Sequence, residues 1–184
     1  MYFTIAFNLF KKFLFTTITK PVYNEDYIMG ILVSGLVNIE TTLQIDTFPL
    51  EYEPVRYPFW GIATTVSGVG LNVSLALHTL GKPVHFCTML GTDVYGEMAH
   101  EWMQHQGLSS EFFIRRLPQT AQSVILYDKA GRRQIHVDLK NIQEQRYPLE
   151  LFEVAIERAS VAVLCNINFN RHLLEVAKEK GIPV

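Results

Sequence analysis

The chain has 184 residues, 48% of them hydrophobic and 18% charged, which is enough apolar material to bury a globular core. Its formal charge of -2 and its isoelectric point near 6.3 provide no basic field that would attract nucleic acid or an anionic membrane surface. We therefore expect no nucleic-acid partner.

Residues 1–28 differ from the rest of the chain. They are rich in aromatic residues, and Lys11 and Lys12 interrupt the apolar stretch in its middle. A secretory signal places its charge before an unbroken apolar segment, and a spanning helix needs about 20 apolar residues, so neither pattern fits. We expect residues 1–28 to be an extension of unknown role, no integral membrane segment, and a domain that begins near Met29.

After the extension, buried strands alternate with helices along the chain. Continuous apolar runs, typical of strands buried on both faces, occur at residues 30–35, 84–90 and 161–167. Helical patterns with start or stop signals lie at residues 72–80, 93–106 and 171–180. This order predicts an α/β fold in which a mostly parallel sheet is flanked by helices.

Two stretches show the alternation of half-buried strands instead. Residues 39–48 and 123–138 alternate between apolar and polar side chains, and the second contains a turn at Gly131 that is typical of a hairpin. They predict a small antiparallel β unit beside the parallel sheet.

The cysteines and histidines form no reactive or metal-binding pattern. Cys87 and Cys165 lie inside apolar, strand-like runs, which favours reduced, buried thiols and a cytoplasmic setting. The histidines show no HExxH or other spacing that places two imidazoles on one helix face. We expect no metal site.

A glycine-rich turn runs from residue 67 to 74. Gly68 and Gly70 let the backbone come close to a bound group, the helix start offers unpaired N–H donors, and Asn72 adds an amide suited to a hydroxyl. A ligand-free strand-to-helix turn explains the same run. A dinucleotide-binding oxidoreductase is a distant alternative, because Val73 occupies the third glycine position of GxGxxG.

The spacing beyond this turn is more specific. The residues concerned are Gly68, Gly70, Asn72, Ser74, Gly81, Gly91, Thr92, Asp93 and Gly96. Together they resemble the first signature of the ribokinase-like, or PfkB-type, family of sugar and nucleoside kinases, with a departure at Ser67, where the family generally has Gly or Ala. Upstream, residues 35–40 resemble the end of the family's first strand. The resemblance runs from Met29 to Val184.

The resemblance implies a set of substrate-binding residues. Asn38 and Glu40 would bind substrate hydroxyls, Gly68 and Gly70 would let the backbone approach the substrate, and Asn72 would add a hydrogen bond. The residue types suit this role, because a carboxylate accepts strongly from hydroxyls and paired polar groups exclude analogues that lack them.

Other positions limit what the resemblance implies about the substrate. Asn166 and Asn168 lie near where relatives place another substrate contact, although strand-end capping explains them equally well. Glu40 is one methylene longer than the family's Asp, which implies a smaller or displaced ligand. Val69 stands where ribokinases have Lys, which argues against ribose. The sequence leaves sugars, sugar phosphates and nucleosides open.

The alternating stretches, at about residues 39–60 and 120–138, correspond to the family's lid over the substrate. In many relatives the lid pairs with that of a second subunit, which implies a homodimer. The family's reaction is ATP-dependent phosphorylation of a hydroxyl of a sugar or nucleoside, and it uses ATP and Mg²⁺.

The family's catalytic motif, a late DTxGAGD-type segment, does not occur in this sequence. In the family its Asp accepts the proton of the attacking hydroxyl, and the nucleotide site lies in the same half. A positioned general base alone contributes roughly 10²- to 10⁴-fold. We therefore expect residues 29–184 to be the N-terminal, substrate-binding part of the kinase fold, inactive alone. The alternative is a non-catalytic module for small-polyol binding or dimerisation.

Overall fold

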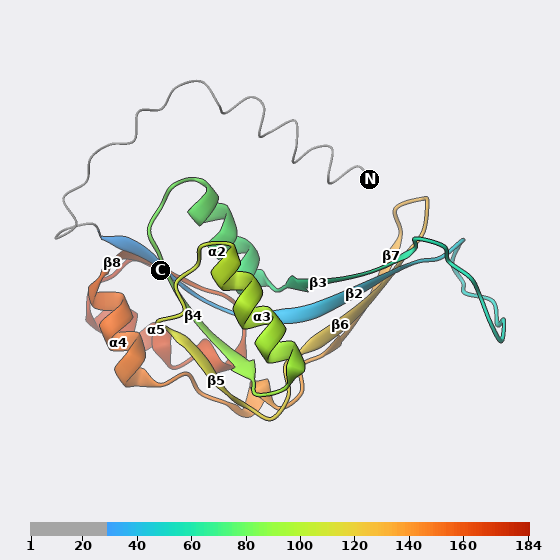
Figure 1. Ribbon diagram of the computed structural model, residues 1–184. Helices are drawn as coiled ribbons and strands as arrows, with labels where there is room; N and C mark the ends of the chain where they lie inside the picture. Colours follow the sequence, from blue (N-terminus) through green and yellow to red (C-terminus); the bar gives the residue numbers. More distant parts are fainter. Residues whose placement is uncertain (1–28) are drawn as a thin grey trace, which may run out of the picture.

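The computed structural model describes residues 29–184, so the predicted extension at residues 1–28 lies outside the described part. The body of the molecule is built on a parallel four-stranded sheet in the order β5-β4-β1-β8. Its strands are β1 (Gly30–Ser34), β4 (Val84–Gly91), β5 (Phe113–Leu117) and β8 (Ala159–Leu164), shown in Figure 1. The predicted α/β fold with a parallel sheet is confirmed.

Helices cover both faces of this sheet. They are α2 (Val69–Thr79), α3 (Val94–His105), α4 (Leu149–Glu157) and α5 (Leu173–Glu179). Two 3-10 turns, η1 (Ile142–Glu144) and η2 (Asn168–Asn170), lie in the connections before α4 and α5. Within residues 29–184, no helix is both long enough and apolar enough to cross a bilayer.

Side chains of the body strands point alternately into two buried clusters. Leu32 of β1 and Cys87 of β4 pack with residues of α4 and α5, whereas their neighbours Val33 and Phe86 pack with residues of α2 and α3. A strand that is buried on both faces reads as a continuous apolar run. This is why β1, β4 and β8 could be predicted from the sequence.

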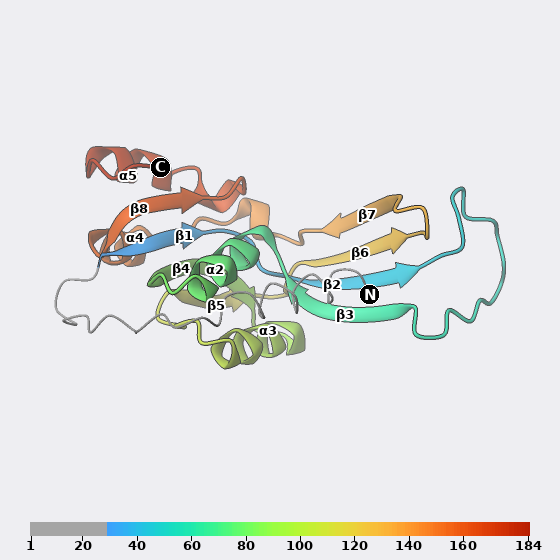
Figure 2. The same cartoon turned by 90° about the horizontal axis from the view of Figure 1, so that it is seen from above.

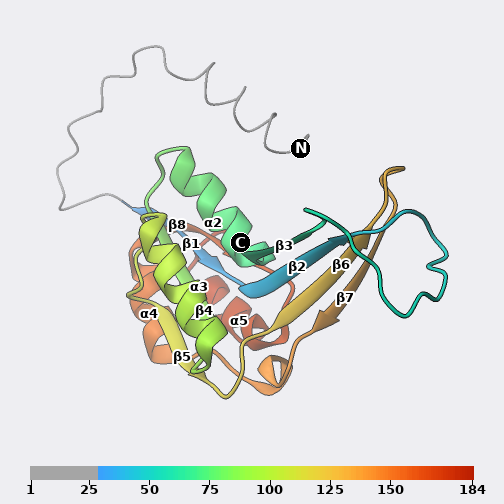
Figure 3. The ribbon, with the colours of Figure 1, turned by 45° about the vertical axis from the view of Figure 1, so that its right-hand side comes forward.

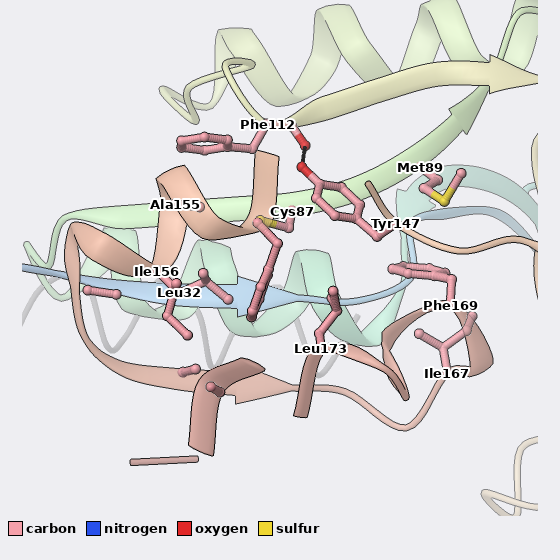
Figure 4. Packing of buried hydrophobic residues seen from close by; sticks show 14 of the residues in the cluster. Leu32, Cys87, Met89, Phe112, Tyr147, Ala155, Ile156, Ile167, Phe169 and Leu173 are labelled. Carbon is pink, nitrogen blue, oxygen red and sulfur yellow. Dashed lines mark hydrogen bonds between the residues drawn. The ribbon is translucent and has the colours of Figure 1, made fainter. Parts of the chain in front are cut away.

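The cluster under α4 and α5 encloses one of the two cysteines. Figure 4 shows Cys87 next to Tyr147, whose hydroxyl donates to the carbonyl of Phe112 at 2.7 Å. Burial raises the pKa of the Cys87 thiol to about 12, so this thiol stays protonated at neutral pH. The prediction of a buried thiol is confirmed for Cys87, while Cys165 is only half-buried.

A second sheet, called the lid sheet below, extends away from the body (Figure 2). Its strands, in the order β3-β2-β6-β7, are β3 (Ile62–Ser67), β2 (Asn38–Gln44), β6 (Gln122–Tyr127) and β7 (Arg133–Asp138). The β6–β7 hairpin is antiparallel, as predicted, and β2 also pairs antiparallel with β3, but β2 and β6 pair in parallel. The lid sheet is therefore mixed, because β2 and β6 both leave the body in the same direction (Figure 3).

Three elements, β3, β5 and α4, were not predicted. β3 (IATTVS) is mostly exposed and β5 (FIRRL) carries two arginines, so neither strand shows a continuous apolar run. α4 follows Pro148 without a side-chain cap, which removes the usual start signal. In addition, α2 begins at Val69 and not at residue 72, and β8 ends at Leu164 and not at residue 167.

Candidate substrate site

The predicted site residues begin where β1 passes the chain to the lid sheet. The N–H of Gly35 donates to the carbonyl of Cys87 at 3.2 Å, and its carbonyl accepts from the Thr88 hydroxyl at 2.9 Å. The carbonyl of Ser34 accepts from the N–H of Cys165 at 2.9 Å. These bonds join the carboxyl ends of β1, β4 and β8, and ligands of open α/β sheets bind outside that edge.

The glycines of the signature pack one backbone turn against another. A Cβ at Gly70 would lie 2.5 Å from the carbonyl carbon of Gly35, and a Cβ at Gly68 would collide with the carbonyl oxygen of Leu36. Gly68 also has a φ of 122°, which L side chains rarely adopt. Glycine at these positions therefore allows the β1–β2 turn to contact the β3–α2 turn directly.

The N–H groups at the start of α2 are hydrogen-bonded within the chain, contrary to the expectation. Those of Gly70 and Leu71 donate to the carbonyl of Leu36 at 3.1 and 3.4 Å, and that of Asn72 donates to the carbonyl of Gly68 at 2.9 Å. The sequence predicted that this helix start offers unpaired donors to a ligand, but these three are bonded within the chain. Contact of Gly68 and Gly70 with a substrate stays a prediction.

Asn38 and Glu40 lie on one face of β2 at the root of the lid sheet, because alternate residues of a strand share a face. Asn38 is only 5% exposed, and its Nδ2 donates to the Oγ of Ser123 at 2.8 Å. Glu40 is half-buried, and its neighbours in the sheet are Thr65 of β3 and Ser123 of β6. The lid root thus gathers an amide, a carboxylate and hydroxyls.

Asn72 lies on the other side of the same turn. Asn38 is the register partner of Ser67, which directly precedes Gly68, and Asn72 is exposed in the first turn of α2. The structure therefore brings Asn38, Glu40, Gly68, Gly70 and Asn72 to one corner between the sheet edge, the lid root and α2.

Asn166 does not join this corner directly. It is exposed just beyond β8 and lines a hollow of about 290 Å³ together with Gln143, Ile167, Asn168 and Arg171. The amide of Asn168 donates to the carbonyl of Gln143 at 2.6 Å, so Asn168 acts in local capping. A substrate contact by Asn166 stays a prediction.

A second hollow, of about 600 Å³, lies at the far end of the lid sheet. It is formed by residues 43–62 together with Lys129. None of the predicted site residues lines it, so it is separate from the corner at the lid root.

The junction between body and lid sheet was not predicted as a functional feature. Asp93 accepts from the N–H of Gly96 at 3.0 Å and from the N–H and hydroxyl of Thr120 at 3.1 and 2.6 Å. Burial opposes ionisation of Asp93, but these hydrogen bonds outweigh it and hold the pKa of the carboxyl below its usual value. Asp93 thus fixes the chain just before β6. The polar residues around Thr120, which are Gln119, Gln122 and Ser123, are a sequence signal that could have indicated this junction.

The parallel sheet flanked by helices, together with the mixed lid sheet, is the ribokinase-like α/β fold. A family model described as pfkB family carbohydrate kinase matches residues 34–180, and the chain belongs to that family. No curated protein sequence matches the chain.

Solved structures with the same fold are distant in sequence. A microbiome-derived acarbose kinase, Mak1, is 23% identical with a TM-score of 0.73, covering 84% of this chain and 51% of its own. An Arabidopsis thaliana ribokinase complexed with ribose and ATP is 21% identical (TM-score 0.71, 84% and 52%). A Burkholderia thailandensis nucleoside kinase in complex with inosine is 16% identical (0.64, 83% and 50%). The chain spans about half the length of these proteins.

Proposed function

We propose that this chain recognises the substrate of an ATP-dependent phosphotransferase that acts on a hydroxyl of a sugar or nucleoside. The reaction joins the substrate oxygen to the γ-phosphorus of ATP, breaks the bond to ADP and releases the hydroxyl proton. The observation that carries the proposal is the position of Asn38 and Glu40, at the lid root next to the packed turns of Gly35 and Gly70, in a chain of the PfkB family.

The chemistry of the corner supports a hydroxylated ligand. Asn38 is nearly buried and Glu40 is half-buried, and both carry oxygen acceptors that a ligand hydroxyl can satisfy. Leaving a buried polar group unpaired costs roughly 1–3 kcal/mol, so a site of this kind rejects analogues that lack the hydroxyl. Asn72, Gly68, Gly70 and Asn166 complete the proposed set.

ATP and Mg²⁺ enter the proposal through the family. Among residues 29–184, no group of three or more His, Cys, Asp or Glu side chains gathers in a way that could hold a metal ion. The GAGD segment is also absent from the sequence. We therefore assign no step of phosphoryl transfer to a residue of this chain, and we propose that the chain binds substrate without phosphorylating it.

Pairing of two chains through the lid sheet is part of the proposal. Both faces of the lid sheet expose large apolar side chains, and such exposure marks interaction surfaces. Ile62 and Val124 lie on one face, and Tyr127, Ile135 and Val137 lie on the other. The free cysteines are compatible with a cytoplasmic setting.

A thermal-shift screen over sugars, sugar phosphates and nucleosides tests the proposal with the full 184-residue chain. A ligand with several hydroxyls is expected to raise the melting temperature, and Asn38→Ala together with Glu40→Ala is expected to abolish the shift. A chain that no such ligand stabilises contradicts substrate recognition. Transfer of labelled phosphate from ATP above a no-enzyme control contradicts the binding-only part.

A non-catalytic module that binds a small polyol or serves dimerisation is the second candidate. The exposed apolar side chains of the lid sheet favour it. The reading frame downstream of codon 184 separates the two candidates, because a GAGD-encoding frame supports the kinase. The oxidoreductase hypothesis loses its support, because the helix-start N–H groups of Gly70 and Leu71 are bonded to Leu36.

A further inference from the structure

Within residues 29–184, Ser123 is the only residue outside the predicted set whose side chain bonds to the side chain of a predicted substrate residue. Its Oγ accepts from Nδ2 of Asn38 at 2.8 Å. Ser123 belongs to β6 and Asn38 to β2, so the bond crosses from one lid strand to its parallel neighbour. Both residues are 5% exposed.

The nitrogen and the oxygen of the Asn38 amide differ in their hydrogen bonding. One N–H of Nδ2 donates to Ser123, whereas Oδ1 has no hydrogen-bond partner within residues 29–184. In that part of the chain, the one solvent-inaccessible side-chain nitrogen or oxygen without a partner is Nε of Arg115. The Oδ1 of Asn38 is therefore unpaired and still accessible.

We propose that Ser123 is a positioning residue that fixes the orientation of the Asn38 amide, so that its Oδ1 faces the substrate and selects a hydrogen-bond donor there. An amide presents a donor on one side and an acceptor on the other. Because Ser123 holds the donor side, the substrate group that meets Oδ1 of Asn38 has to be a donor such as a hydroxyl or an amine. This inference rests on the proposed function of the corner.

The geometry of the lid sheet makes Ser123 suited to this role. Side chains on adjacent strands reach each other directly or along the diagonal. Glu40 is the register partner of Ser123, and Asn38 reaches Ser123 along the diagonal. Ser123 thus contacts the amide from the lid strand that follows the Asp93–Thr120 junction, and it links the position of β6 to the choice of substrate group.

The first test needs no ligand. In the full chain, hydrogen exchange of the Asn38 side-chain amide, assigned by its loss in Asn38→Asp, is measured by NMR. Exchange is expected to be about fivefold faster in Ser123→Ala, as for loss of one hydrogen bond, and unchanged in Ser123→Thr, which keeps the hydroxyl. Equal exchange in the unsubstituted chain and Ser123→Ala overturns the orientation, because Ser123 would then donate to Oδ1.

Thr41→Val is the matched control for this test. Thr41 and Thr64 form another cross-strand hydroxyl pair of the lid sheet, at 3.1 Å, and Thr41 lies on the opposite face of β2 from Asn38. Its substitution removes a lid hydroxyl without touching the corner. Exchange of the Asn38 amide that accelerates equally in Thr41→Val overturns the specific role of Ser123, because the change then reflects loosening of the whole sheet.

The second test measures selection. D-ribose and inosine are compared with analogues in which one hydroxyl at a time is replaced by fluorine, which accepts but does not donate. At the position that meets Asn38, we expect the unsubstituted chain and Ser123→Thr to prefer hydroxyl about fivefold, and Ser123→Ala to lose that preference.

The outcomes separate the inference from the proposed function. Equal weakening of hydroxyl and fluoro ligands by Ser123→Ala overturns the positioning role alone, because a merely structural defect lowers both affinities together. Failure of both probes to bind the unsubstituted chain overturns the substrate role of Ser123. If the wider sugar and nucleoside screen fails as well, the proposed function fails with it, whatever the exchange experiment shows.

Discussion

The body and the lid sheet are stabilised by different interactions. In the body, both faces of the sheet are covered by helices, and side chains such as Leu32 and Phe86 are almost completely inaccessible. In the lid sheet, every residue of β7 is exposed, and most of β3 is exposed as well. The body therefore carries the stability of the described chain, whereas the lid sheet is held mainly by backbone pairing and carries the candidate selection residues.

The largest expected effect comes from the body core. Phe152→Ala removes a fully buried ring under α4 and is expected to destabilise the chain by roughly 3–5 kcal/mol. Ile135→Ala in β7, where the side chain is 47% exposed, should cost less than about 1 kcal/mol. Denaturant unfolding of both variants measures the contrast. Equal losses would remove the distinction between body and lid sheet.

The next effect lies where the two regions meet. Gly70→Ala introduces a Cβ against the backbone of Gly35 and is expected to cost roughly 2 kcal/mol or more, since backbone atoms cannot move aside cheaply. Gly81→Ala is the control, because nothing lies within 4 Å of its Cβ position and only its φ of 73° opposes the change. It should cost about 1 kcal/mol. Equilibrium unfolding compares them, and a Gly70→Ala variant as stable as the original chain contradicts the packing of the two turns.

The Asp93 junction gives a smaller effect that depends on pH. Asp93→Ala removes the helix cap and the bonds to Thr120, and is expected to cost about 1–2 kcal/mol at pH 7. Since the folded pKa of Asp93 is lowered, this stability is present above its unfolded value near 3.9 and is lost as pH falls through the folded pKa.

Asp93→Asn separates the charge from the cap, because Asn also caps helices but does not titrate. Unfolding midpoints measured from pH 7 down to pH 3 should bring the original chain towards Asp93→Asn as the carboxyl is protonated. A constant difference between the two across that range excludes Asp93 as the titrating group.

The smallest effect on stability tests pairing through the lid sheet. Val124→Glu places a charge on a lid side chain that is 42% exposed, so it should change the free energy of unfolding of a single chain by less than about 0.5 kcal/mol. If two lid sheets pair, it should weaken the dimer about tenfold or more in sedimentation. Leu80→Glu, at an exposed position of the body, is the control. Equal sedimentation of all three chains argues against pairing there.

The difference between body and lid sheet also explains how much of the fold could be predicted. β1 and β4 are buried on both faces and β8 is partly buried, so their sequences are largely apolar runs. β3 has no such run, because its side chains are mostly exposed threonines and alanine next to few apolar partners. The start of α2 was placed after Gly70, since glycine disfavours helix interiors, but the contact of Gly70 with Gly35 overrides that preference.

For the candidate site, the sequence indicated residue types and neighbourhoods but not contacts. Asn38 and Gly68 were singled out from the signature, and the register of β2 with β3 brings them together. Ser123 was not identified, because its contact with Asn38 joins residues 85 positions apart and leaves no local pattern. The use of the α2 N–H groups by Leu36 likewise depends on a tertiary contact.

The parallel pairing of β2 with β6 has a mechanical consequence for the lid sheet. The chain enters the lid sheet twice, through residues 35–37 and 118–121, and leaves it twice, near Gly68 and after Asp138. Four chain connections, side by side, thus join the lid sheet to the body, whereas a single hairpin is joined by two. Any closure over a ligand has to bend all four connections together. The lid sheet is therefore expected to move by flexing along the edge where it joins the body.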